Sequence, residues 1–133
     1  MVAYREFGCE LLEQVMSLYQ SEHWTIYAEP DQVGRAFARS LYVLGAFEDE
    51  KLLGFIRCLG DGEYDLLVSD LIVGPEYRRM GIGRTLLSMA MKKYEHVENF
   101  VLMTGLEEED NRRFYRYMGM KEFAENLLIG YIR

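Results

Sequence analysis

The residues best placed to do chemistry lie in one loop, Gly74–Arg84, which reads Gly-Pro-Glu-Tyr-Arg-Arg-Met-Gly-Ile-Gly-Arg. An apolar run, Leu71–Val73, precedes the loop and predicts the end of a strand, because Pro75 cannot donate to a sheet ladder. A helical pattern of apolar residues begins at Arg84. Free N–H groups and the peptide dipole at a helix start attract anions, and glycines allow the backbone to approach them. The loop therefore predicts a phosphate-binding site.

Three phosphate-binding patterns can be compared with this loop. The Walker pattern fails because Arg78 stands at the first glycine and Arg84 replaces the lysine. The dinucleotide fingerprint fails because Leu86 occupies the position of its third glycine. The pattern that remains is Arg78-x-x-Gly81-x-Gly83, placed after a strand and at the opening of a helix.

Periodicity along the chain predicts the elements that must position this loop. Apolar residues at helical spacing predict four helices, at 11–19, 30–41, 84–94 and 107–118. Short apolar runs bounded by turn residues predict strands at 4–7, 42–48, 52–59, 64–73, 100–103, 120–123 and 127–132. The helix between the fourth and fifth strands makes those two parallel. We therefore expect one α/β domain over residues 1–133, with a mixed sheet of six to seven strands.

At these residues the chain resembles the GNAT superfamily of N-acetyltransferases, whose acyl-CoA loop is Gln/Arg-x-x-Gly-x-Gly/Ala. Leu71–Val73 followed by Pro75 matches a second family motif, and Phe114-Tyr115-x-x-x-Gly119-Met120 matches a third. The resemblance implies a GNAT-like domain in which the strands ending near Val73 and Met103 splay apart. The pantetheine arm of acetyl-CoA, the implied co-substrate, would enter that gap.

The resemblance also implies which residues contact acetyl-CoA. Backbone N–H groups of the loop would hold the pyrophosphate, and the preceding strand would pair with pantetheine and polarise the thioester carbonyl. The implied cofactor-binding residues are Leu71, Ile72, Val73, Arg78, Arg79, Met80, Gly81, Ile82, Gly83, Arg84 and Asn111. The chain departs from the family where Glu108 takes the place of the usual asparagine and Asn111 that of the usual alanine.

Two residues are implied to be catalytic. Tyr115 matches the general acid that protonates the departing thiolate, although an aromatic residue on a helix can equally belong to the core. An alkylamine with a pKa of about 10.4 is protonated at neutral pH, so a base helps to remove its proton. Asp70 is the first candidate for this base, and its alternatives are a structural hydrogen bond or a solvent-facing position. Glu29, His23 and a solvent relay are further possibilities for the base.

The acceptor is expected to be a primary amine, either a small cationic molecule or a protein amino group. The implied function is transfer of an acetyl group from acetyl-CoA to this amine. Trp24 and Tyr27, between the first two helices, would line the acceptor site, or would anchor the helix pair. Two other functions stay open, a non-catalytic acyl-CoA-binding module or sensor and a nucleotide-phosphate binder of another class.

Composition narrows the class of protein. The 133 residues carry a net charge of −7, which argues against nucleic-acid binding. No apolar run approaches the roughly 20 residues of a membrane span, so we expect a cytoplasmic protein that does not contact membranes. Cys9 and Cys58 lack metal-site spacing and are expected to be reduced, buried thiols, and no metal is expected. The apolar closing strand at 127–132 could mediate a homodimer.

Overall fold

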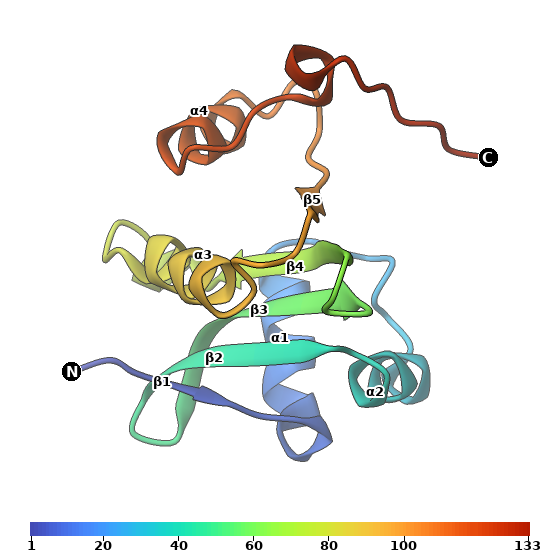
Figure 1. Cartoon of the computed structure of the whole chain (residues 1–133). Coiled ribbons are helices and arrows are strands. Elements are labelled where there is room, and N and C mark those ends of the chain that lie inside the picture. The colour runs from blue at the N-terminus through green and yellow to red at the C-terminus, as the bar shows by residue number, and fades with distance from the viewer. The chain divides into compact units, whose positions relative to one another are not determined.

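The structure is a computed structural model that describes all 133 residues. The chain divides into two compact units, Met1–Leu102 and Met103–Arg133. Figure 1 shows the elements of both units along the chain.

The first unit is built on a five-stranded sheet whose order follows the chain. Its strands are β1 (Ala3–Glu6), β2 (Tyr42–Glu48), β3 (Lys51–Gly60), β4 (Asp65–Val73) and β5 (Asn99–Leu102). The first four pair antiparallel, whereas β5 pairs parallel to β4 after the chain has crossed over through α3 (Ile82–Lys93). The mixed α/β class is therefore confirmed, and so are the first five predicted strands to within a residue or two.

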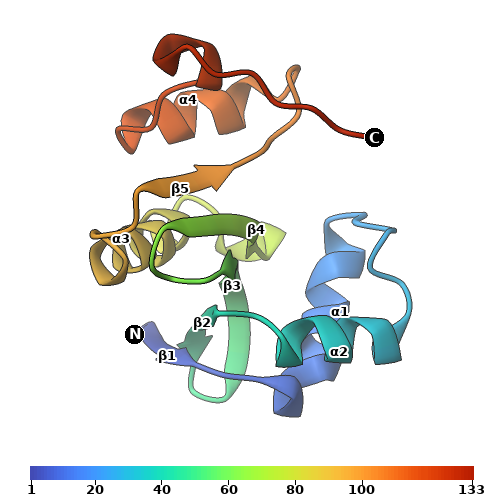
Figure 2. The same cartoon turned by 45° about the vertical axis from the view of Figure 1, so that its right-hand side comes forward.

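Two helical layers cover the sheet. The helices α1 (Leu12–Ser21) and α2 (Pro30–Ala38) lie on one face, and α3 lies on the other (Figure 2). Under α1 and α2, Phe47 and Phe55 are fully buried, and truncating such a side chain to alanine typically costs about 3–5 kcal/mol. Leu86 and Leu87 are equally buried on α3. None of the helices is long and apolar enough to cross a membrane.

The second unit contains α4 (Glu109–Tyr117) and a 3₁₀ turn at Phe123–Asn126. Gly119 ends α4 as predicted, with a φ of 89° that a residue bearing a Cβ rarely adopts. The helix carries charge on much of its surface, and Arg112 and Arg116 both bind the carboxylate of Glu122. These ion pairs connect the helix to the segment that follows it.

The sheet has five strands, so the prediction of six to seven was wrong. The expected strand at 120–123 is replaced by a turn, because Glu122 and Glu125 form a capping box that favours a 3₁₀ helix. The expected strand at 127–132 begins with Leu127 at a φ of 61°, and its large apolar side chains are exposed. An apolar run alone does not make a strand, since a strand also needs a partner. The homodimer prediction loses the strand on which it rested.

The two cysteines differ in their surroundings. Cys58 lies in β3 and is fully buried, as expected, and burial raises the pKa of its thiol from 9.0 to about 12. Cys9 is exposed, so the prediction that both thiols are buried was wrong for this residue. It lies in a short 3₁₀ turn before α1, where its Sγ donates to the carbonyl of Gly34 at 3.3 Å.

Candidate functional site

The end of β4 is paired on one side only. On the β3 side the register continues to Gly54 opposite Val73. On the β5 side the pairing stops at Val68 opposite Leu102. A register shift in the β3–β4 ladder leaves Ser69 as an extra residue, and β4 then runs on without a β5 partner. The backbone of Leu71–Val73, expected to pair with pantetheine, therefore has a free edge.

The loop after β4 is held at its start and strained in its middle. The Gly74 N–H donates to the Leu53 carbonyl at 2.8 Å, and a 3₁₀ turn follows at Pro75–Tyr77. Arg79 has a φ of 66° and Gly81 a φ of 77°, both in the left-handed region. Gly81 is the N-cap of α3, which begins at Ile82, two residues earlier than the helical pattern predicted. These turns direct the backbone into the first turn of the helix.

The backbone N–H groups from Arg78 to Arg84 find no acceptor in the protein. The first N–H of α3 that is satisfied belongs to Thr85, which donates to the Gly81 carbonyl at 3.0 Å. The Thr85 hydroxyl donates to the same oxygen at 2.9 Å. The first N–H groups of any helix lack an intrahelical acceptor, and because this loop is largely exposed they are open to water or to an anionic ligand.

Side chains add positive charge to this loop. Arg78 forms an ion pair with Glu22 at the end of α1, whereas Arg79 and Arg84 are in no ion pair. An open groove of about 480 Å³ follows α3 from Arg84. Its lining residues are Tyr42, Arg84, Thr85, Ser88, Met89, Lys92 and Lys93. In a chain with a net charge of −7, this local excess of cations favours an anionic ligand.

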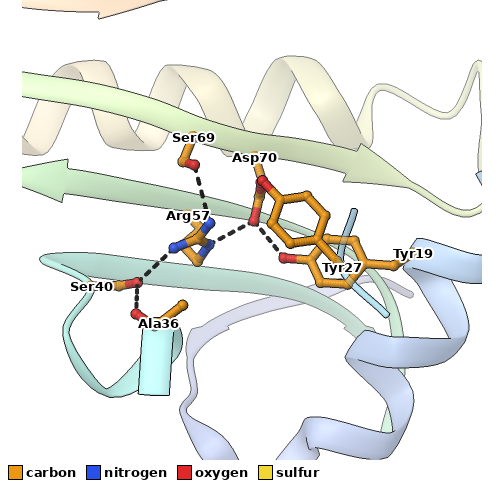
Figure 3. A network of polar contacts seen from close by, with 7 residues as sticks. All are labelled: Tyr19, Tyr27, Ala36, Ser40, Arg57, Ser69 and Asp70. Carbon is orange, nitrogen blue, oxygen red and sulfur yellow. Dashed lines mark hydrogen bonds and ion pairs between the residues drawn. The ribbon is translucent and has the colours of Figure 1, made fainter. Parts of the chain in front are cut away.

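Asp70 lies one residue before the free edge and is buried in a network of polar contacts (Figure 3). Its Oδ2 accepts from Arg57 Nε at 2.6 Å and from the Tyr19 hydroxyl at 2.5 Å, while its Oδ1 accepts from the Tyr27 hydroxyl at 3.0 Å. The side chain points inward and its oxygens are already engaged. The structure shows the structural hydrogen bonds expected as one alternative for Asp70 and excludes the solvent-facing position, while its role as the base stays a prediction.

Arg57 is fixed as firmly as its partner. Its Nη1 donates to Ser40 at 3.3 Å and its Nη2 to Ser69 at 3.1 Å, and the pair with Asp70 is nearly inaccessible to solvent. Burial by itself would lower the pKa of Arg57, but the hydrogen bond and charge of Asp70 outweigh this and raise it. Burial, followed by the negative charge of Asp70, raises the pKa of Tyr19 and of Tyr27, so both hydroxyls keep their protons.

Sequence reasoning missed Arg57 and Tyr19 as members of this network. A signal was present, because Arg57 is the single charge inside the apolar run Leu52–Leu59. A buried charge needs a partner, and Asp70 is the one carboxylate in the neighbouring strand's apolar end. Tyr19 gave no separate signal, since it falls on the apolar face of α1 like any core aromatic.

The aromatic residues expected to line the acceptor site form a stack beside Asp70. The ring of Tyr27 lies 4.3 Å from that of Tyr19, and the ring of Trp24 lies 5.9 Å from Tyr19. Tyr19 is buried, whereas Trp24 and Tyr27 are half-buried and pack at the margin of the core. The structure shows the anchoring role, since these two residues pack the segment between α1 and α2 against the core, while the lining of the acceptor site stays a prediction.

Glu29 and His23, the weaker candidates for the base, lie between α1 and α2. The Glu29 carboxylate accepts from the Asp31 N–H at 2.9 Å and so caps the N-terminus of α2. His23 is exposed in the same segment, with a φ of 57°. No group of three or more His, Cys, Asp or Glu side chains is arranged to hold a metal ion.

Tyr115 and Asn111 lie in the second unit, whereas the other predicted site residues all lie in the first. Both belong to α4, and Tyr115 packs edge-on against Phe114 at 5.2 Å. Burial raises the pKa of Tyr115, so its phenol stays protonated at neutral pH. Asn111 is exposed, and its Nδ2 donates to the Thr104 hydroxyl at 3.3 Å.

Known proteins have structures similar to that of this chain. A GNAT-family acetyltransferase from Streptococcus pneumoniae TIGR4 has a structure similar to this chain, with 32% identity, a TM-score of 0.87, and coverage of 100% of this chain and 97% of that one. The PaiA N-acetyltransferase of Thermoplasma acidophilum, solved in complex with coenzyme A, shows 27% identity and a TM-score of 0.74, over 91% and 90% of the two chains.

A curated relative extends the comparison to sequence. The uncharacterized N-acetyltransferase ycf52-like of Prochlorococcus marinus is 30% identical over an alignment of 98 positions that covers 68% of this chain. The alignment covers 53% of that protein, so the chain spans about half the length of this curated relative. The sequence profile of the Acetyltransferase (GNAT) family matches residues 9–120. That match takes in the free edge, the loop and α4, and the chain belongs to the GNAT acetyltransferase family.

Proposed function

We propose that this protein transfers the acetyl group of acetyl-CoA to a primary amine. The observation that carries the proposal is the run of unpaired N–H groups from Arg78 to Arg84, directly after the free edge of β4. A pyrophosphate supplies the acceptors that this run lacks, and an extended amide chain such as pantetheine supplies a partner for the free edge. The coenzyme A complex of the Thermoplasma relative supports the same ligand.

Different groups of the chain bind acetyl-CoA and assist the transfer of its acetyl group. The loop amides and the cations Arg79 and Arg84 hold the phosphates, and the edge of Leu71–Val73 holds the pantetheine arm. One N–H of that edge donates to the thioester oxygen as negative charge develops on it. The amine nitrogen bonds to the carbonyl carbon as the carbon–sulfur bond breaks. The ammonium loses one proton to water before this attack. Tyr115 then gives its proton to the departing thiolate, and the second proton, released from the nitrogen as the amide forms, returns through water to Tyr115.

Water is the proposed acceptor of the amine's proton. Asp70 would be a poor base in this arrangement, because protonating it would break hydrogen bonds to Tyr19 and Tyr27 and would leave the buried Arg57 without its counter-charge. Glu29 is occupied as a helix cap. A relay of water between the amine and bulk solvent needs neither residue.

Ligand-dependent melting tests the cofactor. A ligand that binds only the folded chain raises its melting temperature, so we expect acetyl-CoA to raise it in a concentration-dependent manner, with ATP and NAD far less effective. Stabilisation by ATP alone would overturn the proposal. Turnover is tested by screening amines with a thiol-release assay. Stabilisation by acetyl-CoA without turnover of any amine would instead favour a non-catalytic acyl-CoA-binding module.

The substitution Tyr115→Phe tests the general acid. It removes one hydroxyl from a residue whose phenol stays protonated at neutral pH. We expect kcat to fall about a hundredfold, in the range typical of a lost acid, while the affinity for acetyl-CoA changes little. Tyr117→Phe, on an exposed residue of the same helix, is the matched control and should keep full turnover. Unchanged turnover in Tyr115→Phe would remove this residue from the mechanism.

A further inference from the structure

The hydroxyls of Tyr19 and Tyr27 share one carboxylate but differ in exposure. Tyr19 donates to Asp70 Oδ2 and is 1% exposed, so its oxygen has no access to a ligand. Tyr27 donates to Oδ1 at 3.0 Å and is half-buried. The two rings are stacked, and Figure 3 shows both hydroxyls directed at the same carboxylate.

A phenol has one hydrogen, and Tyr27 has already placed it on Asp70. Its oxygen can therefore only accept further hydrogen bonds. The acceptor capacity of that oxygen is left for a donor on a ligand. A ligand that meets Tyr27 must bring a donor, and an ammonium group brings three.

Arg57 fixes the direction of the hydrogen bond between Tyr27 and Asp70. As long as the Arg57–Asp70 ion pair stands, Asp70 stays ionised and cannot donate to Tyr27, so the Tyr27 hydroxyl cannot reverse its direction. The pair is neutral as a whole, which makes long-range attraction small and leaves recognition to short-range contacts. The half-buried rings of Trp24 and Tyr27 add faces that favour a cation.

We propose that Tyr27 is a specificity-determining residue that accepts a hydrogen bond from the protonated acceptor amine, and that Asp70 and Arg57 are positioning residues that fix the direction of its hydroxyl. This inference rests on the proposed function, because it names the residue that selects the amine. It predicts that the site prefers an ammonium group to an uncharged group of the same size.

The test uses the fluorescence of Trp24, which is the only tryptophan in the chain. The full chain is titrated with diaminobutane and with butanediol, its uncharged counterpart of similar size. We expect saturable quenching by diaminobutane and none by butanediol. In Tyr27→Phe the dissociation constant for diaminobutane should rise about tenfold, since a hydrogen bond to a charged group is lost. With an amine that is turned over, KM for the amine should rise about tenfold, and kcat and KM for acetyl-CoA should stay within about twofold.

Tyr19→Phe is the matched control, because it removes the other hydroxyl from the same carboxylate. It should lower stability and leave the dissociation constant for diaminobutane within about twofold. Equal weakening in both variants, equal binding of butanediol, or no binding of diaminobutane by the unmodified chain would each overturn the inference. The amine screen distinguishes this failure from that of the proposed function, since acetylation could persist without a role for Tyr27.

Discussion

Two neighbouring regions of the first unit are the network around Asp70 in β4 and the loop that follows β4. They differ in whether their polar groups have hydrogen-bond partners within the protein. Around Asp70, every buried side-chain polar atom has a hydrogen-bond partner, and the ion pair with Arg57 is sealed from solvent. In the loop that follows, the N–H groups from Arg78 to Arg84 have no protein acceptor. The chain satisfies its own charges in the first region and leaves its donors unpaired in the second.

The contrast teaches which polar groups are available for chemistry. A charged residue near a site invites a catalytic role, but Asp70 is surrounded by donors that the fold itself supplies. The loop contains no acidic or basic group that the mechanism must titrate, yet its exposed amides are free to donate to an anion. In this protein, unpaired donors indicate the ligand site better than the presence of an ionisable side chain does.

The largest effect is expected from removing the negative charge of Asp70 from its buried hydrogen-bond network. Asp70→Asn keeps the shape of the side chain but leaves the Arg57 guanidinium buried without a counter-charge. We expect the free energy of unfolding to fall by about 3–5 kcal/mol, as is typical when one partner of a buried ion pair is removed. Urea denaturation followed by circular dichroism measures this loss.

Glu50→Gln provides the control for this prediction. It breaks the Arg5–Glu50 pair, whose atoms are 3.4 Å apart and largely exposed, and should change stability by less than about 1 kcal/mol. If Asp70→Asn kept full stability and lost turnover, the comparison would reverse, and Asp70 would act as a base rather than as a structural partner.

Prediction from sequence succeeded where pattern and local geometry decide the structure. The loop is recognisable because Gly81 and Gly83 follow Arg78 at fixed spacing, and the left-handed φ of Gly81 shows why a glycine stands there. The sequence held a signal that Arg57 and Asp70 are partners, but their contact geometry was out of reach, since it depends on the register of two strands and on a bulge at Ser69. The closing strand failed for a related reason, because the apolar run Leu127–Ile132 carries no information about a strand partner.

The next largest effect is expected on the affinity for acetyl-CoA, from a change in the loop after β4. Gly81→Ala introduces a Cβ at a φ of 77°, where the nearest heavy atom would be Arg84 Nη2 at 3.5 Å, so the variant meets backbone strain rather than a clash. Strain of about 1–2 kcal/mol is relieved by turning the loop, which redirects its free N–H groups. We expect the affinity for acetyl-CoA, measured by calorimetry, to fall about tenfold.

Gly62→Ala is a strain-matched control for the loop variant. Gly62 has a φ of 72°, lies in the turn between β3 and β4, and its new Cβ would meet the flexible end of Leu41 at 3.2 Å. It should lose a similar amount of stability and keep its affinity for acetyl-CoA. If both variants lost affinity equally, general destabilisation would explain the effect, and the orientation of the loop amides would not matter.

The smallest expected effect comes from the Cys58 thiol, which lies outside the hydrogen-bond network around Asp70. Cys58 is fully buried, and burial raises the pKa of its thiol from 9.0 to about 12. In the unfolded chain this thiol ionises near its ordinary pKa, so the unfolded state binds fewer protons and stability falls as pH rises from about 9 towards 12. Between pH 9 and 10 the part of this loss that comes from Cys58 should be about 1 kcal/mol, taken as the difference between the unmodified chain and Cys58→Ala in urea midpoints at each pH.

Tyrosines contribute to the pH dependence in the same window, because those with a raised pKa begin to ionise in the unfolded chain below pH 10. Tyr42, for example, has its pKa raised by burial from 10.0 to about 12. The contribution of Cys58 is therefore the difference in slope between the unmodified chain and Cys58→Ala. This variant should lower stability at neutral pH through a small cavity and reduce the loss between pH 9 and 10 by about 1 kcal/mol. Cys9→Ala, at the surface, should keep the full slope. An unchanged slope in Cys58→Ala would show that this thiol ionises equally in the folded and unfolded chain, which would weaken the contrast between a sealed interior and an open loop.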